Sequence, residues 1–106
     1  MMITGSPGGS TIITTVLQSI CNMIDGNMNV DNVVAAPRFH HQWYPDVVRY
    51  ERGAVDKTTL EILKAMGHTF REVSAIGRCD AIIAYPGKRV VEGCSDPRGY
   101  GAAVAE

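Results

Sequence analysis

The clearest hydrophobic pattern lies in residues 11–25, where apolar side chains recur at helical spacing. This spacing predicts an amphipathic helix with one buried apolar face. Its polar side contains Thr14, Gln18, Ser19 and Asn22. The expected terminator is Gly26-Asn27. The apolar positions are Ile12, Ile13, Val16, Leu17, Ile20, Cys21, Met23 and Ile24.

Shorter patterns predict two more helices. One spans residues 31–36, with Asp31 as its N-cap and Pro37 as its stop. The other begins after the N-cap Asp56 and ends at Gly67. The spacing of this helix predicts that it buries Leu60, Leu63 and Met66.

Short apolar runs between turn residues predict the strands. They lie at residues 47–51, 69–73, 80–85 and 89–94, and residues 3–5 are either the end of a short strand or an entry loop. The last two strands form a hairpin across Pro86-Gly87. The connector at 38–46 has no clear period, and the Gly/Ala-rich tail at 95–106 is expected to be extended or loosely ordered.

These elements predict one α/β (α+β) domain over residues 1–106. Helices would cover one face of a mainly antiparallel sheet of about four or five strands. An open sheet of this kind leaves an edge that needs a partner, so a homo-oligomer that pairs through sheet edges is one expectation.

Composition narrows the class of partner. The formal net charge of −1 offers no basic stripe for nucleic acid. No stretch is long and apolar enough to cross a membrane. The three cysteines, an odd number without CxxC spacing, argue against a disulfide framework and a zinc site. Cys21 is expected in the core, whereas Cys79 and Cys94 fall at strand ends with no activating neighbour.

The glycine-rich turn Gly5-Ser6-Pro7-Gly8-Gly9-Ser10 runs directly into the first predicted helix. Backbone N–H groups at such a place form an anion pocket, and Gly8 and Gly9 would allow close approach of a ligand. This geometry suits an oxyanion hole as well as a phosphate. The alternative is a simple tight turn in which Ser10 or Thr11 caps the helix. The turn matches neither a Walker loop nor GxGxxG.

Other polar pairs favour structural roles. His40-His41 lacks a carboxylate at metal-site spacing, so one ring is expected to pack beside Phe39 and Trp43 and the other to bond to backbone. Thr14 and Thr15 lie mid-helix, where hydroxyls are typically exposed or bonded back to the helix.

Two arginines are also expected to have structural roles. Arg38 has apolar neighbours, which favours a buried structural pair over a ligand arm. Asp96-Pro97-Arg98 is expected to form a local ion pair after the last strand, with a substrate-carboxylate clamp by Arg98 as the alternative.

Three motifs occur in one order along nearly the whole chain. Residues 5–18 resemble the start of the C-terminal part of γ-glutamyltranspeptidase small subunits. The stretch 36–43, with Pro45-Asp46, resembles the next signature of that family, and 95–98 resembles its closing motif. Cephalosporin acylases and capsule-depolymerising transpeptidases share the fold, but the stretch Arg-Phe-His-His-Gln-Trp favours the γ-glutamyl branch.

The resemblance implies a segment of an N-terminal nucleophile hydrolase, a four-layer αββα sandwich built from two subunits of one precursor. In that family an N-terminal threonine attacks the γ-glutamyl carbonyl of glutathione or a related amide, and its own α-amine acts as the base. The acyl group then passes to water or an amine. The family's Pro-Gly-Gly supplies oxyanion-hole N–H groups, which correspond to Gly8 and Gly9. No cofactor is implied.

The chain departs from the family pattern in lacking the nucleophile motif, a threonine followed by Thr/Ser-His. The resemblance therefore implies a C-terminal small-subunit fragment, inert alone, whose partners are the rest of that subunit and the large subunit. The family suggests a periplasmic, secreted or cell-surface location, with a cytoplasmic one open. The alternative is a non-catalytic α/β assembly domain that pairs through a sheet edge.

Overall fold

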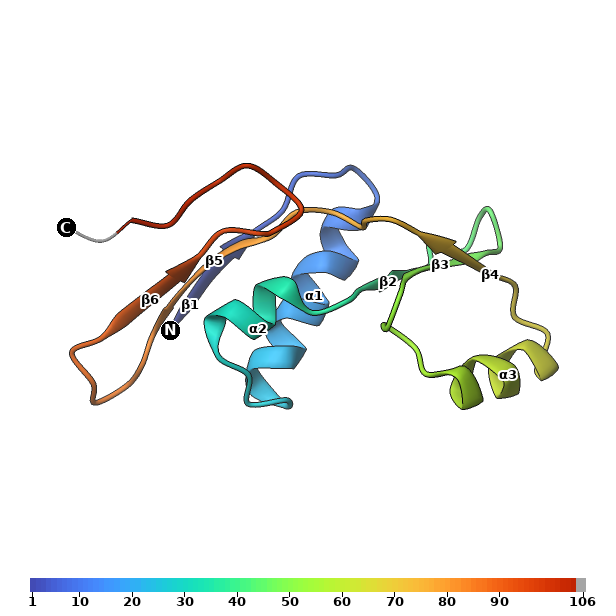
Figure 1. The fold of residues 1–106 in the computed structure, drawn as a ribbon, viewed down its shortest axis with the longest axis horizontal. Coiled ribbons are helices and arrows are strands. Elements are labelled where there is room, and N and C mark those ends of the chain that lie inside the picture. The colour runs from blue at the N-terminus through green and yellow to red at the C-terminus, as the bar shows by residue number, and fades with distance from the viewer. Residues whose placement is uncertain (105–106) are drawn as a thin grey trace. The chain divides into compact units, whose positions relative to one another are not determined.

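A computed structural model describes residues 1–104 of the chain (Figure 1). The chain divides into two compact units, one formed by Met1–Ala36 with the chain from Gly77 onward and the other by Pro37–Ile76. Among the described residues, the first unit combines two helices with an antiparallel sheet, and the second combines one helix with a mixed sheet. The α/β class is therefore confirmed.

The first unit is built on a sheet of three strands in the order β1-β5-β6 (Figure 1). The strands are β1 (Met2–Gly5), β5 (Asp80–Ala84) and β6 (Val91–Cys94), and both pairings are antiparallel. The predicted hairpin is therefore confirmed. In register, Ile82 lies between Ile3 of β1 and Gly93 of β6.

Two helices pack on this sheet, α1 (Thr11–Ile24) and α2 (Val30–Ala35). The buried core consists of Val30 and Val34 of α2 with Ala81 and Ile83 of β5. Burial alternates along β5, as expected for a strand with one covered face. The opposite face presents Ile3, Ile82 and Val91, which are 60%, 48% and 68% exposed.

Helix α1 turns the opposite face inward from the one that its hydrophobic pattern predicts. Its buried residues are Thr11, Thr15 and Ser19, while Ile13 and Leu17 are 76% and 55% exposed. Cys21 is exposed as well, so its predicted core position is wrong. Of the predicted apolar positions, Val16 and Met23 are half-buried and Met23 packs against the core, whereas most of the others face away from it.

The cause is a close approach between α1 and residues 77–79. A Cβ at Gly77 would lie 2.5 Å from the Thr15 Oγ1, and the Ser19 Oγ lies 3.2 Å from the Cys79 Sγ. Only small side chains fit at this distance, because interiors are close-packed. Steric fit therefore overrides the hydrophobic pattern.

One helix boundary differs from the prediction and another agrees with it. Asn29 rather than Asp31 caps α2, because its side chain accepts a hydrogen bond from the Asn32 N–H. Helix α1 ends just before the predicted terminator Gly26-Asn27, and the left-handed residue of that pair is Asn27 (φ +48°). Asparagine tolerates this conformation better than most residues.

The second unit holds another sheet of three strands, in the order β2-β3-β4. Its elements are β2 (Phe39–His40), β3 (Val48–Glu51), α3 (Lys57–Ala65) and β4 (Phe70–Val73). The strands β3 and β4 are parallel, joined through α3 as a βαβ crossover requires. The prediction of one sheet with four or five strands is therefore wrong, and β2 lies in a segment predicted as a connector.

Helix α3 begins and ends as predicted. The Asp56 carboxylate accepts a hydrogen bond from the Thr59 N–H, and Gly67 adopts φ +100° after the last turn. Leu60 and Leu63 are half-buried. Met66 is 71% exposed, so its predicted burial is wrong.

The tail is more ordered than its composition suggests. Asp96 is 1% exposed, and the Gly99 N–H donates to the Asp96 carbonyl in a turn. Residues 105–106 of the predicted extended tail lie outside the described residues.

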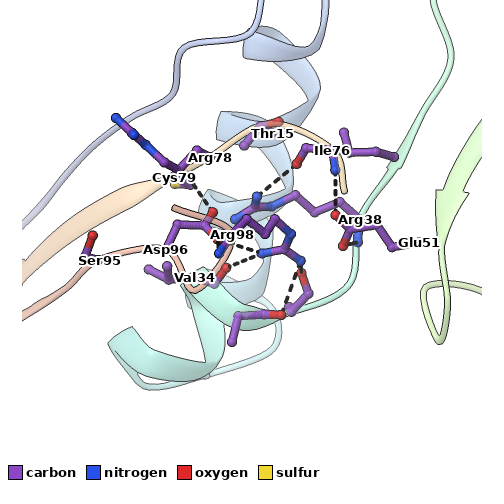
Figure 2. Close-up of polar contacts among 12 residues, drawn as sticks. Thr15, Val34, Arg38, Glu51, Ile76, Arg78, Cys79, Ser95, Asp96 and Arg98 are labelled. Atoms are coloured by element: carbon purple, nitrogen blue, oxygen red, sulfur yellow. Dashed lines mark hydrogen bonds and ion pairs between the residues drawn. The ribbon is translucent and has the colours of Figure 1, made fainter. Parts of the chain in front are cut away.

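A buried carboxylate holds the two ends of the second unit together (Figure 2). Glu51, 5% exposed, accepts hydrogen bonds from the Arg38 N–H at 3.0 Å and the Ile76 N–H at 2.6 Å. The Arg38 guanidinium donates to the Ile76 carbonyl at 3.0 Å. Arg38 is 2% exposed, which confirms the buried structural role predicted for it.

Replacing this carboxylate should destabilise the fold. Glu51→Gln offers one acceptor oxygen where two N–H groups need partners, so we expect the free energy of unfolding to fall by about 1–3 kcal/mol. Urea denaturation measures this loss. The control Glu61→Gln changes an exposed residue of α3 and should alter the midpoint little. Equal effects of the two substitutions would contradict the role of Glu51.

Candidate functional site

The glycine-rich turn connects β1 to α1 and adopts backbone angles that glycine favours. Gly8 has φ +133° and Gly9 has φ +59°, both in the region that other residues rarely occupy. A Cβ at Gly8 would lie 2.5 Å from the Thr11 Oγ1. The turn therefore requires glycine at position 8 for both conformation and space.

The N–H groups of Gly8 and Gly9 are available to a ligand. Both residues are exposed, and within residues 1–104 neither N–H donates a hydrogen bond. Ser10 occupies the N-cap position of α1 without a side-chain capping bond, and the first turn carries no acidic residue. These free donors and the positive end of the helix dipole together favour an anion.

Thr11 does not cap α1 in the predicted way. Its Oγ1 donates to the Gly8 carbonyl at 2.9 Å, and its N–H donates to the same oxygen at 3.2 Å. The hydroxyl therefore engages a carbonyl of the turn and leaves the N–H groups free.

Residues 77 and 78 support the turn, although the sequence pattern did not single them out. The Arg78 N–H donates to the Ser6 Oγ at 3.3 Å, and Gly77 (φ +63°) lies against Gly8. Ser6 in turn donates to the Pro7 carbonyl at 2.7 Å. The glycine pair in the sequence indicated the turn, but only tertiary contact shows what holds it.

The predicted ion pair between Asp96 and Arg98 is present (Figure 2). The Asp96 Oδ1 accepts from the Arg98 Nη1 at 3.0 Å, and its Oδ2 accepts from the Cys79 N–H at 2.6 Å. Arg98 also donates to the carbonyls of Val34 and Ala36 at the end of α2. These bonds give Arg98 a structural role, and its side chain is 13% exposed.

Asp80 joins the start of β5 to the end of β6. Its Oδ1 accepts from the Ser95 hydroxyl at 2.8 Å and from the Asp96 N–H at 3.1 Å. These bonds, that of Ser95 first, hold the pKa of the Asp80 carboxyl below its usual value. The ionised carboxylate is thus part of the folded structure.

All three cysteines are free thiols. Cys79 is fully buried, with its Sγ 2.9 Å from the Thr4 Oγ1. Burial and then the nearby Asp31 carboxylate raise the pKa of the Cys94 thiol to about 11. This agrees with the absence of an activating neighbour expected for Cys94.

The histidine pair does not converge on one point. The His40 Nε2 lies 3.0 Å from the Gln42 Oε1 and the ring is buried, whereas the His41 Nε2 lies 3.0 Å from the Asp46 Oδ1. The Trp43 N–H donates to the His41 Nδ1 at 3.4 Å, so the backbone bond expected of one histidine is confirmed, and the Trp43 side chain is 83% exposed. Among the described residues, no cluster of His, Cys, Asp or Glu could hold a metal ion.

The two threonines of α1 differ. The Thr14 Oγ1 donates back to the Thr11 carbonyl at 3.2 Å, as predicted. Thr15 is fully buried, and within the described part of the chain its Oγ1 has no hydrogen-bond partner.

No described helix is long and apolar enough to span a bilayer.

Comparison with known proteins assigns this architecture to a family. The sequence model of the family described as Gamma-glutamyltranspeptidase matches residues 1–106. The chain belongs to the γ-glutamyltranspeptidase family. It is 47% identical over 97 residues to the glutathione hydrolase proenzyme of Escherichia coli (strain K12). The aligned region covers 92% of this chain and 16% of that protein.

Solved structures support the same family. A γ-glutamyltranspeptidase T380A mutant of Helicobacter pylori matches with a TM-score of 0.86 and 44% identity, over 92% of this chain and 54% of that one. The expected N-terminal nucleophile hydrolase fold is thereby confirmed. The transpeptidase CapD of Bacillus anthracis matches with a TM-score of 0.83 at 18% identity, over 99% of this chain and 63% of that one, which shows the shared fold.

The network around Asp80 should make stability depend on pH. A carboxyl with a lowered folded-state pKa adds stability above its unfolded pKa, and that stability is lost as pH falls through the folded pKa. Asp80→Asn should therefore lose less stability than the parent between about pH 6 and about pH 3. Urea midpoints at both pH values measure this. Ser95→Ala should act in the same direction, and an unchanged pH dependence in both variants would contradict the role of Asp80.

Proposed function

We propose that this chain supplies the oxyanion-binding turn of a γ-glutamyltransferase/glutathione hydrolase, with the N–H groups of Gly8 and Gly9 as donors. The observation that carries the proposal is that Gly8 and Gly9, just before α1, are exposed and that neither N–H donates a hydrogen bond within residues 1–104. Membership of the family supports it. The relative in Escherichia coli is named a glutathione hydrolase proenzyme.

The chemistry follows from where charge develops. Attack on the γ-glutamyl carbonyl converts its oxygen to an oxyanion, and two N–H donors lower the energy of that state more than that of the substrate. The acyl group is then transferred to water or to an amine. Glutathione and other γ-glutamyl amides are the proposed substrates, and no cofactor is needed for this reaction.

The nucleophile has to come from outside this chain. The family's threonine motif is absent from the sequence, and an oxyanion hole does not replace a missing nucleophile. The chain alone should therefore be inert. Its proposed partners are the remainder of the small subunit and the large subunit of the same precursor. The family suggests a periplasmic, secreted or cell-surface location, with a cytoplasmic one open.

The exposed apolar surfaces of the first unit support such partners. The stripe of α1 contains Ile13 and Ile24, which are 76% and 67% exposed, and the open sheet face contains Ile3 and Val91. Exposed apolar surface that gathers on one side of an element is typical of an interaction site. Of these elements, β1 and α1 adjoin the glycine turn, so partners that cover them would lie near the proposed site.

A complementation assay tests the proposal. We expect no release of p-nitroaniline from γ-glutamyl-p-nitroanilide by the chain alone, because no nucleophile is present. Activity should appear when the chain is mixed with a complementary fragment that carries the threonine and the large subunit. The complementary fragment alone is the control. Enzyme-like turnover by the isolated chain would contradict the proposal.

The alternative, a non-catalytic domain that pairs through a sheet edge, is favoured by one feature. Within residues 1–104, β1 and β6 are each paired on one side only, which leaves two open edges. If edge pairing is the function, size-exclusion chromatography should show a dimer or larger species. A stable monomer would count against this alternative and leave the first proposal unaffected.

A further inference from the structure

Two peptide groups present the candidate donors, and the structure holds each of them by its carbonyl. A peptide group is planar and trans, so its C=O and N–H point in opposite directions. Fixing the carbonyl of one residue therefore fixes the direction of the N–H of the next. The relevant peptide groups are Pro7–Gly8 and Gly8–Gly9.

The first peptide group is held by Ser6. The Ser6 Oγ donates to the Pro7 carbonyl at 2.7 Å and accepts from the Arg78 N–H at 3.3 Å. The hydroxyl thus links the Pro7–Gly8 peptide to the segment that leads into β5. Its donor bond directs the Gly8 N–H away from Ser6.

The second peptide group is held by Thr11. The Gly8 carbonyl accepts from both the Thr11 N–H at 3.2 Å and the Thr11 Oγ1 at 2.9 Å. Thr11 is 8% exposed, so its hydroxyl is shielded from competing water. These two bonds direct the Gly9 N–H away from the helix.

Both hydroxyls act in the reverse sense to an ordinary helix cap. A capping side chain accepts a hydrogen bond from a free N–H at the start of the helix and thereby occupies it. Here the hydroxyls of Ser6 and Thr11 donate to carbonyls. The turn is therefore held while neither glycine N–H donates a hydrogen bond to any of the described residues.

We propose that Ser6 and Thr11 are positioning residues, whose hydroxyls aim the N–H groups of Gly8 and Gly9 at the developing oxyanion. Their role in catalysis rests on the proposed function of the glycine turn, whereas their control of the two peptide planes does not. Neither side chain needs to touch the substrate.

Backbone dynamics test the positioning directly in the full 106-residue chain. In ¹⁵N relaxation measurements, Gly8 and Gly9 of the parent should show order parameters near the rigid value of about 0.85. Ser6→Ala should lower the value at Gly8, and Thr11→Val should lower that at Gly9, toward the flexible range of about 0.6. Unchanged values in both variants, or a flexible turn in the parent, would overturn the proposal.

Matched variants distinguish a specific effect of the Ser6 and Thr11 hydroxyls on the glycine N–H groups from a general increase in the mobility of the turn. Ser10→Ala removes an exposed neighbouring hydroxyl that makes no capping bond, so it should leave both glycines rigid. Ser6→Thr and Thr11→Ser keep the hydroxyls and should restore the parent values, which also covers the case in which Ala or Val variants fold poorly. Loosening by Ser10→Ala equal to that by Ser6→Ala would overturn the proposal.

Kinetics in the complemented enzyme then test the catalytic consequence. Loss of one oxyanion donor lowers kcat by about 100- to 1000-fold, so a misdirected donor should lower it by about 10- to 100-fold with KM unchanged. Loosened glycines with unchanged kcat would overturn the proposed function of the turn and leave its positioning by the hydroxyls supported. A lower kcat without loosening would overturn the positioning role and leave the proposed function standing.

Discussion

The close approach between α1 and residues 77–79 is the constraint on which the first unit depends. Gly77 has no side chain and faces the fully buried Thr15, and Ser19 contacts the Cys79 thiol further along the helix. This contact selects the small, polar face of α1 as the inner face. In this arrangement the buried Thr15 hydroxyl has no hydrogen-bond partner among the described residues. Such an unpaired group lowers the free energy of unfolding by about 1–3 kcal/mol. The same contact brings Arg78 to Ser6 and so sets the position of the glycine turn.

Buried carboxylates perform a related task where the chain leaves regular structure. Asp96 accepts the Cys79 N–H before β5 begins, and Glu51 accepts the N–H groups of Arg38 and Ile76. Those N–H groups have no place in a sheet ladder, and an unpaired buried N–H is costly. Each carboxylate therefore joins segments far apart in the sequence. The arginines nearby complete the pattern, because Arg38 and Arg98 donate to backbone carbonyls.

The sheet of the first unit and α1 both carry exposed apolar side chains. One face of the β1-β5-β6 sheet is covered by helices, while the other carries exposed Ile3, Ile82 and Val91. The outward stripe of α1 is equally apolar. The glycine turn lies between β1, which carries Ile3, and α1. Part of the exposed apolar surface is therefore next to the turn in the chain.

Local features of this protein could be predicted from the sequence, because they depend on neighbouring residues. The capped start of α3 at Asp56, the hairpin of β5 and β6, the glycine turn, the Asp96–Arg98 pair and the family follow from short motifs. The inner face of α1, the separation into two sheets and the clamp at Glu51 depend on residues distant in the chain. Hydrophobic spacing shows that a helix has an apolar face, but not whether that face meets its own core or another part of a larger protein. Only tertiary packing decides this, because it determines which surfaces fit closely enough to exclude water.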